Sequence, residues 1–201
     1  MRRTVAVIGI PLVLAVMAGC GATRPSKYYT LEVPDKPPAT GHSYPVSLLV
    51  GRFAAPHLFR DDRLVYRSRN AEMGTYEYHR WAEPPTEMLE TMLVRLLRAS
   101  GQYRSVELLR SNARGDYIVR GRLSALEEVD DGSPLARVAL EIELYSPKTG
   151  TTVWSHFYRH DEPVNGKTVP AVVEALNRNV QSGLAETVAG LDQYFAEHPP
   201  K

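Results

Sequence analysis

The chain has 201 residues, of which 43% are hydrophobic and 23% charged, with 24 basic residues against 23 acidic ones. This length suits one domain that is large enough to bury its own core. The balanced charge argues against a nucleic-acid-binding protein, which normally carries a strongly basic surface. We therefore expect no nucleic-acid partner.

The first nineteen residues have the layout of a secretory signal. Arg2 and Arg3 precede an apolar run from Val5 to Met17, and small residues follow it, as at a cleavage site. The run is roughly a dozen residues long, whereas a membrane-spanning helix needs about 20, and Pro11 interrupts it. Residues 1–19 are therefore predicted to be a cleaved signal peptide.

The only cysteine of the chain follows this signal directly. Met17-Ala18-Gly19-Cys20 resembles the bacterial lipobox, with methionine in place of the more usual leucine. The resemblance implies that the Cys20 thiol receives a diacylglyceryl group and that the new amine is acylated. Two or more fatty chains, at about 0.8 kcal/mol per buried CH₂, hold a protein on a membrane durably. In the alternative interpretation, Cys20 is a bystander within an ordinary signal peptide.

Residues 20–45 have the composition of a tether. Prolines recur among Gly, Ser, Thr and Lys, and they favour an extended chain. Some 25 residues at about 3.3 Å each would reach on the order of 80 Å. One segment inside this range, Lys27–Val33, has the alternation and the aromatic residues of a strand, and docking on the domain edge would shorten the free tether.

Residues 46–198 are predicted to form a single domain that begins with strands. Val46–Phe53 is apolar and β-branched, and Arg63–Arg67 and Thr75–His79 follow as shorter strands. Pro84 and Pro85 then open a helix that ends at Gly101, a typical C-cap residue. Its apolar residues fall on one helical face: Met88, Leu89, Met92, Leu93, Leu96 and Leu97.

The second half of the domain predicts a three-strand meander and a long helix. Apolar and polar residues alternate over 117–125 and 137–144, and a further strand covers 153–160, with turns at Asp130-Asp131-Gly132 and Pro147-Lys148-Thr149-Gly150. This pattern indicates antiparallel strands with one buried and one wet face. The final helix runs from about Val169 to Phe195, and its predicted seam consists of Val173, Leu176, Val180, Leu184, Val188, Leu191 and Phe195.

The order of these elements predicts the fold class. Strands, a helix, more strands and a final helix indicate an α+β or mixed α/β fold. We expect a mixed, largely antiparallel sheet, ending in the meander and covered by two main helices.

Motifs for small-molecule chemistry are incomplete in this sequence. Gly166-Lys167-Thr168 invites a phosphate-loop interpretation, but Asp161 stands where that motif needs a glycine. His156 and His160 can share a strand face, yet zinc needs three or four convergent ligands. We therefore expect no cofactor and no metal.

No catalytic constellation is evident either. The paired carboxylates Asp61-Asp62 and Glu127-Glu128 lie beside turns or among arginines, and we interpret both pairs as solvated charge. A periplasmic hydrolase with dispersed catalytic residues is an alternative, but it would need a nucleophile and base that are not visible. The chain is predicted not to be an enzyme.

Several segments together resemble the family of ABC-type transport auxiliary lipoproteins, which includes paraquat-inducible protein C. The matching pieces run through most of the mature chain: the lipobox at Cys20, Tyr28–Leu31, Arg60–Arg67, the Arg80-Trp81-Ala82-Glu83-Pro84-Pro85 segment that leads into a helix, and the late meander with its long helix. The Arg-Trp-Ala-Glu-Pro sequence is the most specific of these.

The resemblance implies a non-enzymatic accessory of a mammalian-cell-entry (MCE) type transporter, which moves lipids between the inner and outer membranes and supports envelope integrity. It also implies an anticodon-binding-domain-like sandwich and a periplasmic or inner-membrane transporter subunit as partner, with a homo-oligomer as a further possibility. Gly21 follows Cys20, whereas aspartate there commonly retains lipoproteins in the inner membrane. We therefore expect the periplasmic face of the outer membrane.

The corner around Arg-Trp-Ala-Glu-Pro has two interpretations. Trp81 can fix the helix to the core while Arg80 pairs with Glu83, or the corner can contact a partner, since aromatic residues and arginine typically anchor interfaces. On the second interpretation, the candidate contacts are Tyr66, Arg67, Arg80 and Trp81. A structural or regulatory envelope lipoprotein that acts on a cell-wall enzyme or an outer-membrane assembly is the alternative function.

Overall fold

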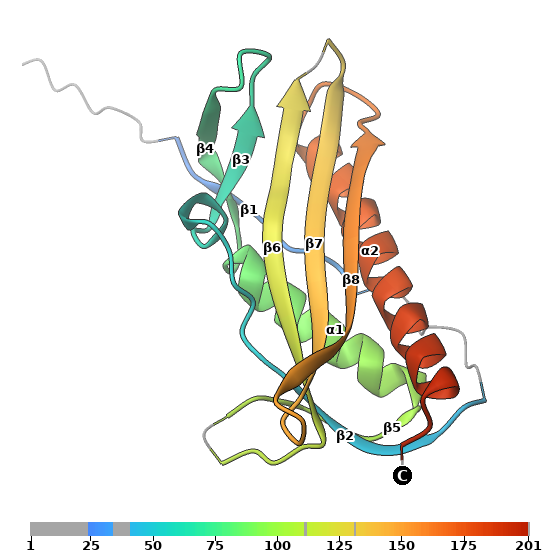
Figure 1. The fold of residues 1–201 in the computed structure, drawn as a ribbon. Coiled ribbons are helices and arrows are strands. Elements are labelled where there is room, and N and C mark those ends of the chain that lie inside the picture. The colour runs from blue at the N-terminus through green and yellow to red at the C-terminus, as the bar shows by residue number, and fades with distance from the viewer. Residues whose placement is uncertain (1–23, 34–40, 111, 131, 201) are drawn as a thin grey trace, which may run out of the picture.

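The computed structural model describes residues 24–33, 41–110, 112–130 and 132–200 (Figure 1). Cys20, the signal peptide and part of the predicted tether lie outside these residues. In chain order, the elements are β1 (Lys27–Tyr29), β2 (Tyr44–Val50), the short helix η1 (His57–Phe59), β3 (Arg63–Arg67), β4 (Met73–Trp81), α1 (Pro85–Ser100), β5 (Tyr103–Leu108), β6 (Tyr117–Asp130), β7 (Pro134–Ser146), β8 (Thr151–Pro163) and α2 (Val169–Glu197).

The strands form one eight-stranded mixed sheet around β6. One side of β6 pairs in parallel with β2 over its first half and with β3 over its second half. The other side pairs antiparallel with β7, which pairs antiparallel with β8. The edges of the sheet are β1 and β5 on one side and β8 on the other. The predicted α+β fold, with a mixed sheet and a late meander, is confirmed.

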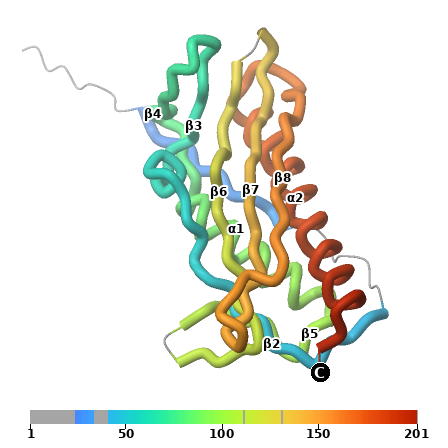
Figure 2. Tube along the Cα trace, in the orientation of Figure 1, coloured from blue at the N-terminus to red at the C-terminus, as the bar shows by residue number. Residues whose placement is uncertain are grey.

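Both helices pack on the same face of the sheet, as the ribbon and the tube show (Figures 1 and 2). The side chains beneath them include Leu123, Leu140, Ile142 and Leu144, all fully buried. We call the opposite face, which neither helix covers, the open face. Among the described residues, no helix combines the length and the apolar character that crossing a membrane requires.

The two predicted helices are confirmed together with their apolar faces. Helix α1 starts after Pro84 and ends at Gly101, whose left-handed φ of 69° suits a glycine C-cap. In α2, the Thr168 side chain accepts a hydrogen bond from the backbone of Ala171 and caps the first turn. Every apolar residue predicted for either seam is buried.

Helix α2 also buries polar residues that the sequence pattern did not reveal. Asn179 is 1% exposed; its Nδ2 donates to the carbonyl oxygens of Ala136 and His160, and its Oδ1 accepts from the Tyr158 hydroxyl at 2.6 Å. Each polar atom of this amide therefore has a partner, as burial requires. The network joins α2 to β7 and β8 at defined positions.

Strand β1 lies inside the range that the sequence assigned to the tether. It pairs in parallel with β4, so that Lys27 lies opposite His79 and Tyr29 opposite Trp81. The chain then passes over the helix layer, where Leu31 is buried and the backbone of Glu32 donates to the Asn177 side chain. The described segment Lys27–Val33 is therefore docked on the folded domain, as a shorter free tether requires.

Candidate functional site

Trp81 is a core residue and not a surface contact. Its side chain is 1% exposed, and its backbone N–H donates to the carbonyl oxygen of Asp62 at 2.6 Å. The indole fixes the end of β4 just before Pro84 and Pro85 begin α1. A residue this buried cannot anchor a partner, so the contact role considered for Trp81 is corrected in favour of the structural one.

Arg80 pairs with a different carboxylate from the one expected. Its Nη1 donates to Oδ1 of Asp62 at 2.7 Å, and both side chains are partly exposed. The expected pairing of Arg80 with Glu83 is therefore wrong. Asp61 accepts a hydrogen bond from the backbone of Asp62, which lowers the pKa of Asp61. The first carboxylate pair thus organises the loop before β3.

Arg67 holds a buried carboxylate. Its Nε and Nη2 donate to the two carboxylate oxygens of Glu127 at 3.0 and 3.1 Å, and Glu127 is 1% exposed. The interpretation of Glu127 as solvated charge is therefore wrong. A buried charge is tolerated when it is paired and hydrogen-bonded in this bidentate manner. Arg67 consequently supports the fold of the β3–β6 junction.

Tyr66 points away from Arg67, because successive side chains of a strand face opposite sides of the sheet. It is 37% exposed and packs edge-to-face on Tyr76, with ring centroids 5.2 Å apart. Tyr76 donates its hydroxyl to Glu128, and burial raises the pKa of Tyr76. The four residues proposed from the sequence are thus divided between the core and both faces of the sheet.

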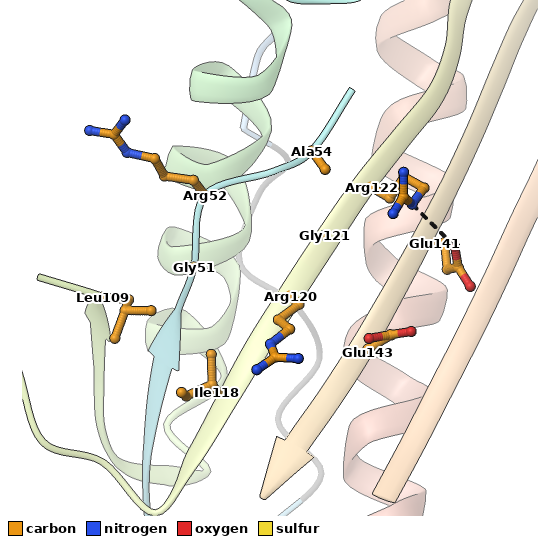
Figure 3. Close-up of a pocket in the computed structure, with 10 residues that line it drawn as sticks. All are labelled: Gly51, Arg52, Ala54, Leu109, Ile118, Arg120, Gly121, Arg122, Glu141 and Glu143. Carbon is orange, nitrogen blue, oxygen red and sulfur yellow. Dashed lines mark ion pairs between the residues drawn. The ribbon is translucent and has the colours of Figure 1, made fainter. Parts of the chain in front are cut away.

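A different set of residues lines a shallow groove of about 620 Å³ on the open face (Figure 3). Gly51, Arg52 and Ala54 come from the chain after β2, Leu109 follows β5, and β6 and β7 supply the remainder. The lining residues are Gly51, Arg52, Ala54, Leu109, Ile118, Arg120, Gly121, Arg122, Glu141 and Glu143. We call this feature the open-face groove.

The groove combines apolar surface with paired charges. Arg122 lies opposite Glu141 in the strand register, with 3.7 Å between its Nε and a carboxylate oxygen. Arg120 instead stacks its guanidinium on the Tyr145 ring, 3.8 Å from the centroid. Such a mixture of arginine, aromatic and aliphatic groups is typical of protein interfaces.

Gly121 lets the chain after β2 pack closely against β6. A Cβ built there would lie 2.3 Å from the Phe53 ring, which is almost fully buried. The missing side chain therefore lets Phe53 pack directly against β6, while the backbone of Ala54 bonds to that of Gly121 and Leu123. The packing lies on the helix-covered face, and it holds the chain after β2 along β6, where Gly51 and Ala54 line the groove.

The open face continues to the sheet edge at β8. Among the described residues, this 13-residue strand pairs only with β7. Phe157, opposite Glu141 in the register, is 61% exposed on this face. A long unpaired edge with an exposed aromatic residue is a ready template for another strand or surface.

Metal and phosphate chemistry receive no support from the described residues. His156 lies 3.5 Å from Glu186 and His160 lies 3.6 Å from Glu162, and no cluster of three potential ligands forms in this part of the chain. Gly166 belongs to a turn, and Thr168 caps α2. The residues singled out for small-molecule binding therefore have local structural roles.

Comparison with solved structures places this fold among bacterial proteins. A Xanthomonas campestris protein of the DUF330 family superposes with a TM-score of 0.78 and 23% identity, covering 86% of this chain and 98% of that one. A PelC dodecamer from Paraburkholderia phytofirmans matches with a TM-score of 0.50 and 17% identity, covering 77% and 92%. No curated protein sequence matches the chain significantly.

The sequence also matches a family model. The match runs from residue 29 to residue 189 and thus includes every strand from β2 to β8, α1 and most of α2. The family is described as the ABC-type transport auxiliary lipoprotein component. The chain therefore belongs to the family of ABC-type transport auxiliary lipoproteins.

Proposed function

We propose that this protein is a non-enzymatic docking component of an MCE-type ABC system that transports lipids between membranes and thereby supports envelope integrity. The family match over residues 29–189 carries the proposal, because it identifies an auxiliary transport component across nearly the whole folded chain. The groove supports it, since its lining suits contact with a protein surface.

The anchor in this proposal is Cys20. Residues 1–19 would be removed, Cys20 would carry the acyl chains, and the folded domain would lie at the periplasmic face of the outer membrane. The lipoprotein family and the signal-like sequence before Cys20 support this assignment. Gly21, which follows the cysteine, supports export to the outer membrane.

The docking surface in this proposal is the open-face groove together with the edge of β8. A periplasmic MCE-type subunit of the transporter is the expected occupant. Phe157 and Arg120 are its best anchors, because one is an exposed aromatic residue and the other a guanidinium held on an aromatic ring. A second copy of this chain is the competing occupant, given the dodecamer formed by PelC.

Deletion of the gene followed by complementation tests this function. The deletion strain should become sensitive to detergent and lose lipid exchange between its membranes. The wild-type gene should restore both properties, whereas Cys20→Ser, whose folded domain is unchanged, should restore neither. Normal lipid exchange in the deletion strain would contradict a transport role and would favour a structural envelope lipoprotein.

A further inference from the structure

We propose that the β1 edge of the sheet is a membrane-contact surface, at which Tyr28, Lys27 and Arg24 meet the lipid headgroups. The proposal rests on the lipidation of Cys20 proposed above. It adds an orientation that the family assignment does not contain: the β1 edge faces the anchoring membrane and the β8 edge faces away from it.

The chain between Cys20 and the folded domain is short. Strand β1 begins at Lys27, seven residues after Cys20. At 3.3–3.6 Å per residue, this segment spans about 25 Å at most. Helix α2, with 29 residues, is about 44 Å long. The tether is therefore shorter than the domain, which must stay beside its membrane and not reach far from it.

Strand β1 is held on the sheet, so the segment between Cys20 and the domain cannot be lengthened by releasing β1. Three residues of β1 pair with β4, and Tyr29 shares a 2.7 Å hydrogen bond with His79. Leu31, just beyond, is 5% exposed. Peeling β1 away to lengthen the tether would break these contacts and expose Leu31 to water. The membrane therefore meets the part of the domain that surrounds β1.

The side chains at this edge suit a lipid surface. Tyr28 is 64% exposed, and tyrosine is enriched at membrane–water interfaces. Arg24 and Lys27 are also exposed, with Lys27 on the opposite face of the strand from Tyr28. The Arg24 guanidinium lies 5.6 Å from the centroid of the Tyr78 ring. Glu77, exposed on β4, acts on Tyr78 with the opposite sign to Arg24 and offsets part of this charge. Burial, and then the positive charges of Lys27 and Arg24, lower the pKa of His79.

The sheet topology separates the proposed membrane contact from the proposed docking surface. Strand β1 lies at one edge of the sheet and β8 at the opposite edge, beyond β4, β3, β6 and β7 (Figure 1). A membrane at β1 therefore leaves the β8 edge and Phe157 directed away from the lipid. This is the position from which a partner can reach them.

A site-specific fluorophore tests the orientation in the lipidated full-length mature protein. Acylation blocks Cys20, so a cysteine introduced elsewhere is the only reactive thiol. Tyr28→Cys and Phe157→Cys form a matched pair, because both replace exposed aromatic residues on edge strands. Each variant is labelled with an environment-sensitive dye and reconstituted in vesicles of phosphatidylethanolamine and phosphatidylglycerol that carry nitroxide headgroups.

We expect several-fold stronger quenching at residue 28 than at residue 157. Replacing Arg24 and Lys27 together by glutamate should lower the quenching at residue 28, whereas Arg159→Glu on β8 should not. Equal quenching at both positions, or none at residue 28, would overturn the proposal while leaving the transport role intact, provided that mass spectrometry shows the acyl chains. If mass spectrometry shows no acyl chains on Cys20, both the proposed anchor and this orientation are refuted. If the fluorescence of the dye at residue 28 changes only when a protein is added, and not with the nitroxide lipid, the β1 edge contacts a protein and not the membrane.

Discussion

Arg67 and Glu127 form a bidentate ion pair that joins β3 to β6, although 60 residues separate them in the sequence. Glu127 lies opposite Arg137 in the strand register, and Arg137 in turn donates two 2.7 Å hydrogen bonds to Asp161 on β8. Four side chains on four neighbouring strands thus form one ionic row across the open face.

Removal of the Arg67 guanidinium should destabilise the domain. Arg67→Ala would leave the Glu127 carboxylate buried without its partner, a change that typically costs about 3–5 kcal/mol. Urea unfolding of the purified domain measures this loss. The control is Arg69→Ala, since Arg69 lies 3.9 Å from Asp130 with both side chains well exposed, and it should change stability by less than about 0.5 kcal/mol. Equal stability of the two variants would show that Glu127 does not depend on Arg67.

Asp161 should contribute to the pH dependence of stability. The hydrogen bonds from Arg137 lower the pKa of Asp161 below its ordinary value of 3.8. The ionised form is therefore favoured in the folded state, so its contribution is complete above that value and is lost as the pH falls through the folded-state pKa.

The urea midpoint, measured from pH 6 down to pH 2, checks this expectation. The wild-type midpoint should fall over the acidic part of this range, and Asp161→Asn should flatten part of that fall. Arg137→Gln should flatten it similarly, because Asp161 would then lose the partner that lowers its pKa. An unchanged slope in Asp161→Asn would rule out this source of acid sensitivity.

Much of the fold could be predicted because its elements are long and periodic. Helices α1 and α2 each repeat the helical spacing of apolar residues over many residues, and strands β6–β8 repeat the two-residue alternation. Both patterns can be identified from the local sequence alone. Strand β5 was not predicted, because it is short and mixes Arg104, Ser105 and Glu107 with its apolar residues. Its position follows from parallel pairing with β2, a contact distant in sequence.

The alternation in β6 was less reliable near Ala125. A register shift between Leu123 and Ala125 places Leu126 opposite Val138 on the helix-covered face, and Ala125 opposite Ala139 on the other. Glu127 consequently lies on the open face beside Arg67 and Arg137. Without knowledge of this β-bulge, a simple period of two could not identify the partners of Glu127.

The candidate site was harder to predict than the fold. Arg120 and Arg122 alternate with apolar residues and indicated only a wet face. The groove also needs Gly51 and Leu109, which directly follow β2 and β5. Nothing local in the sequence brings these segments beside β6. Trp81 was a typical interface residue by type, and only its tertiary packing identified it as core.

Gly121 should resist replacement, because its missing side chain accommodates Phe53. In Gly121→Ala, the added Cβ would meet the ring at 2.3 Å, and overpacking of this kind costs about 1–3 kcal/mol. The thermal midpoint measures the loss. Adding Phe53→Leu should recover part of the midpoint lost in Gly121→Ala, since it removes the clashing ring atoms. If Gly121→Ala alone is as stable as wild type, the Phe53 ring can move away from β6 at little cost, which would contradict this prediction.

The affinity of the mature domain for the periplasmic part of the proposed MCE-type subunit tests the docking proposal most directly. Titration calorimetry without membranes should detect binding by the wild-type domain. Phe157→Asp should weaken this binding by at least about tenfold, equivalent to about 1.4 kcal/mol, because Phe157 is exposed on the proposed docking surface. Tyr28→Asp, at the opposite edge, should bind like wild type. No binding by the wild-type domain, or equal affinity of Phe157→Asp and wild type, would contradict the account.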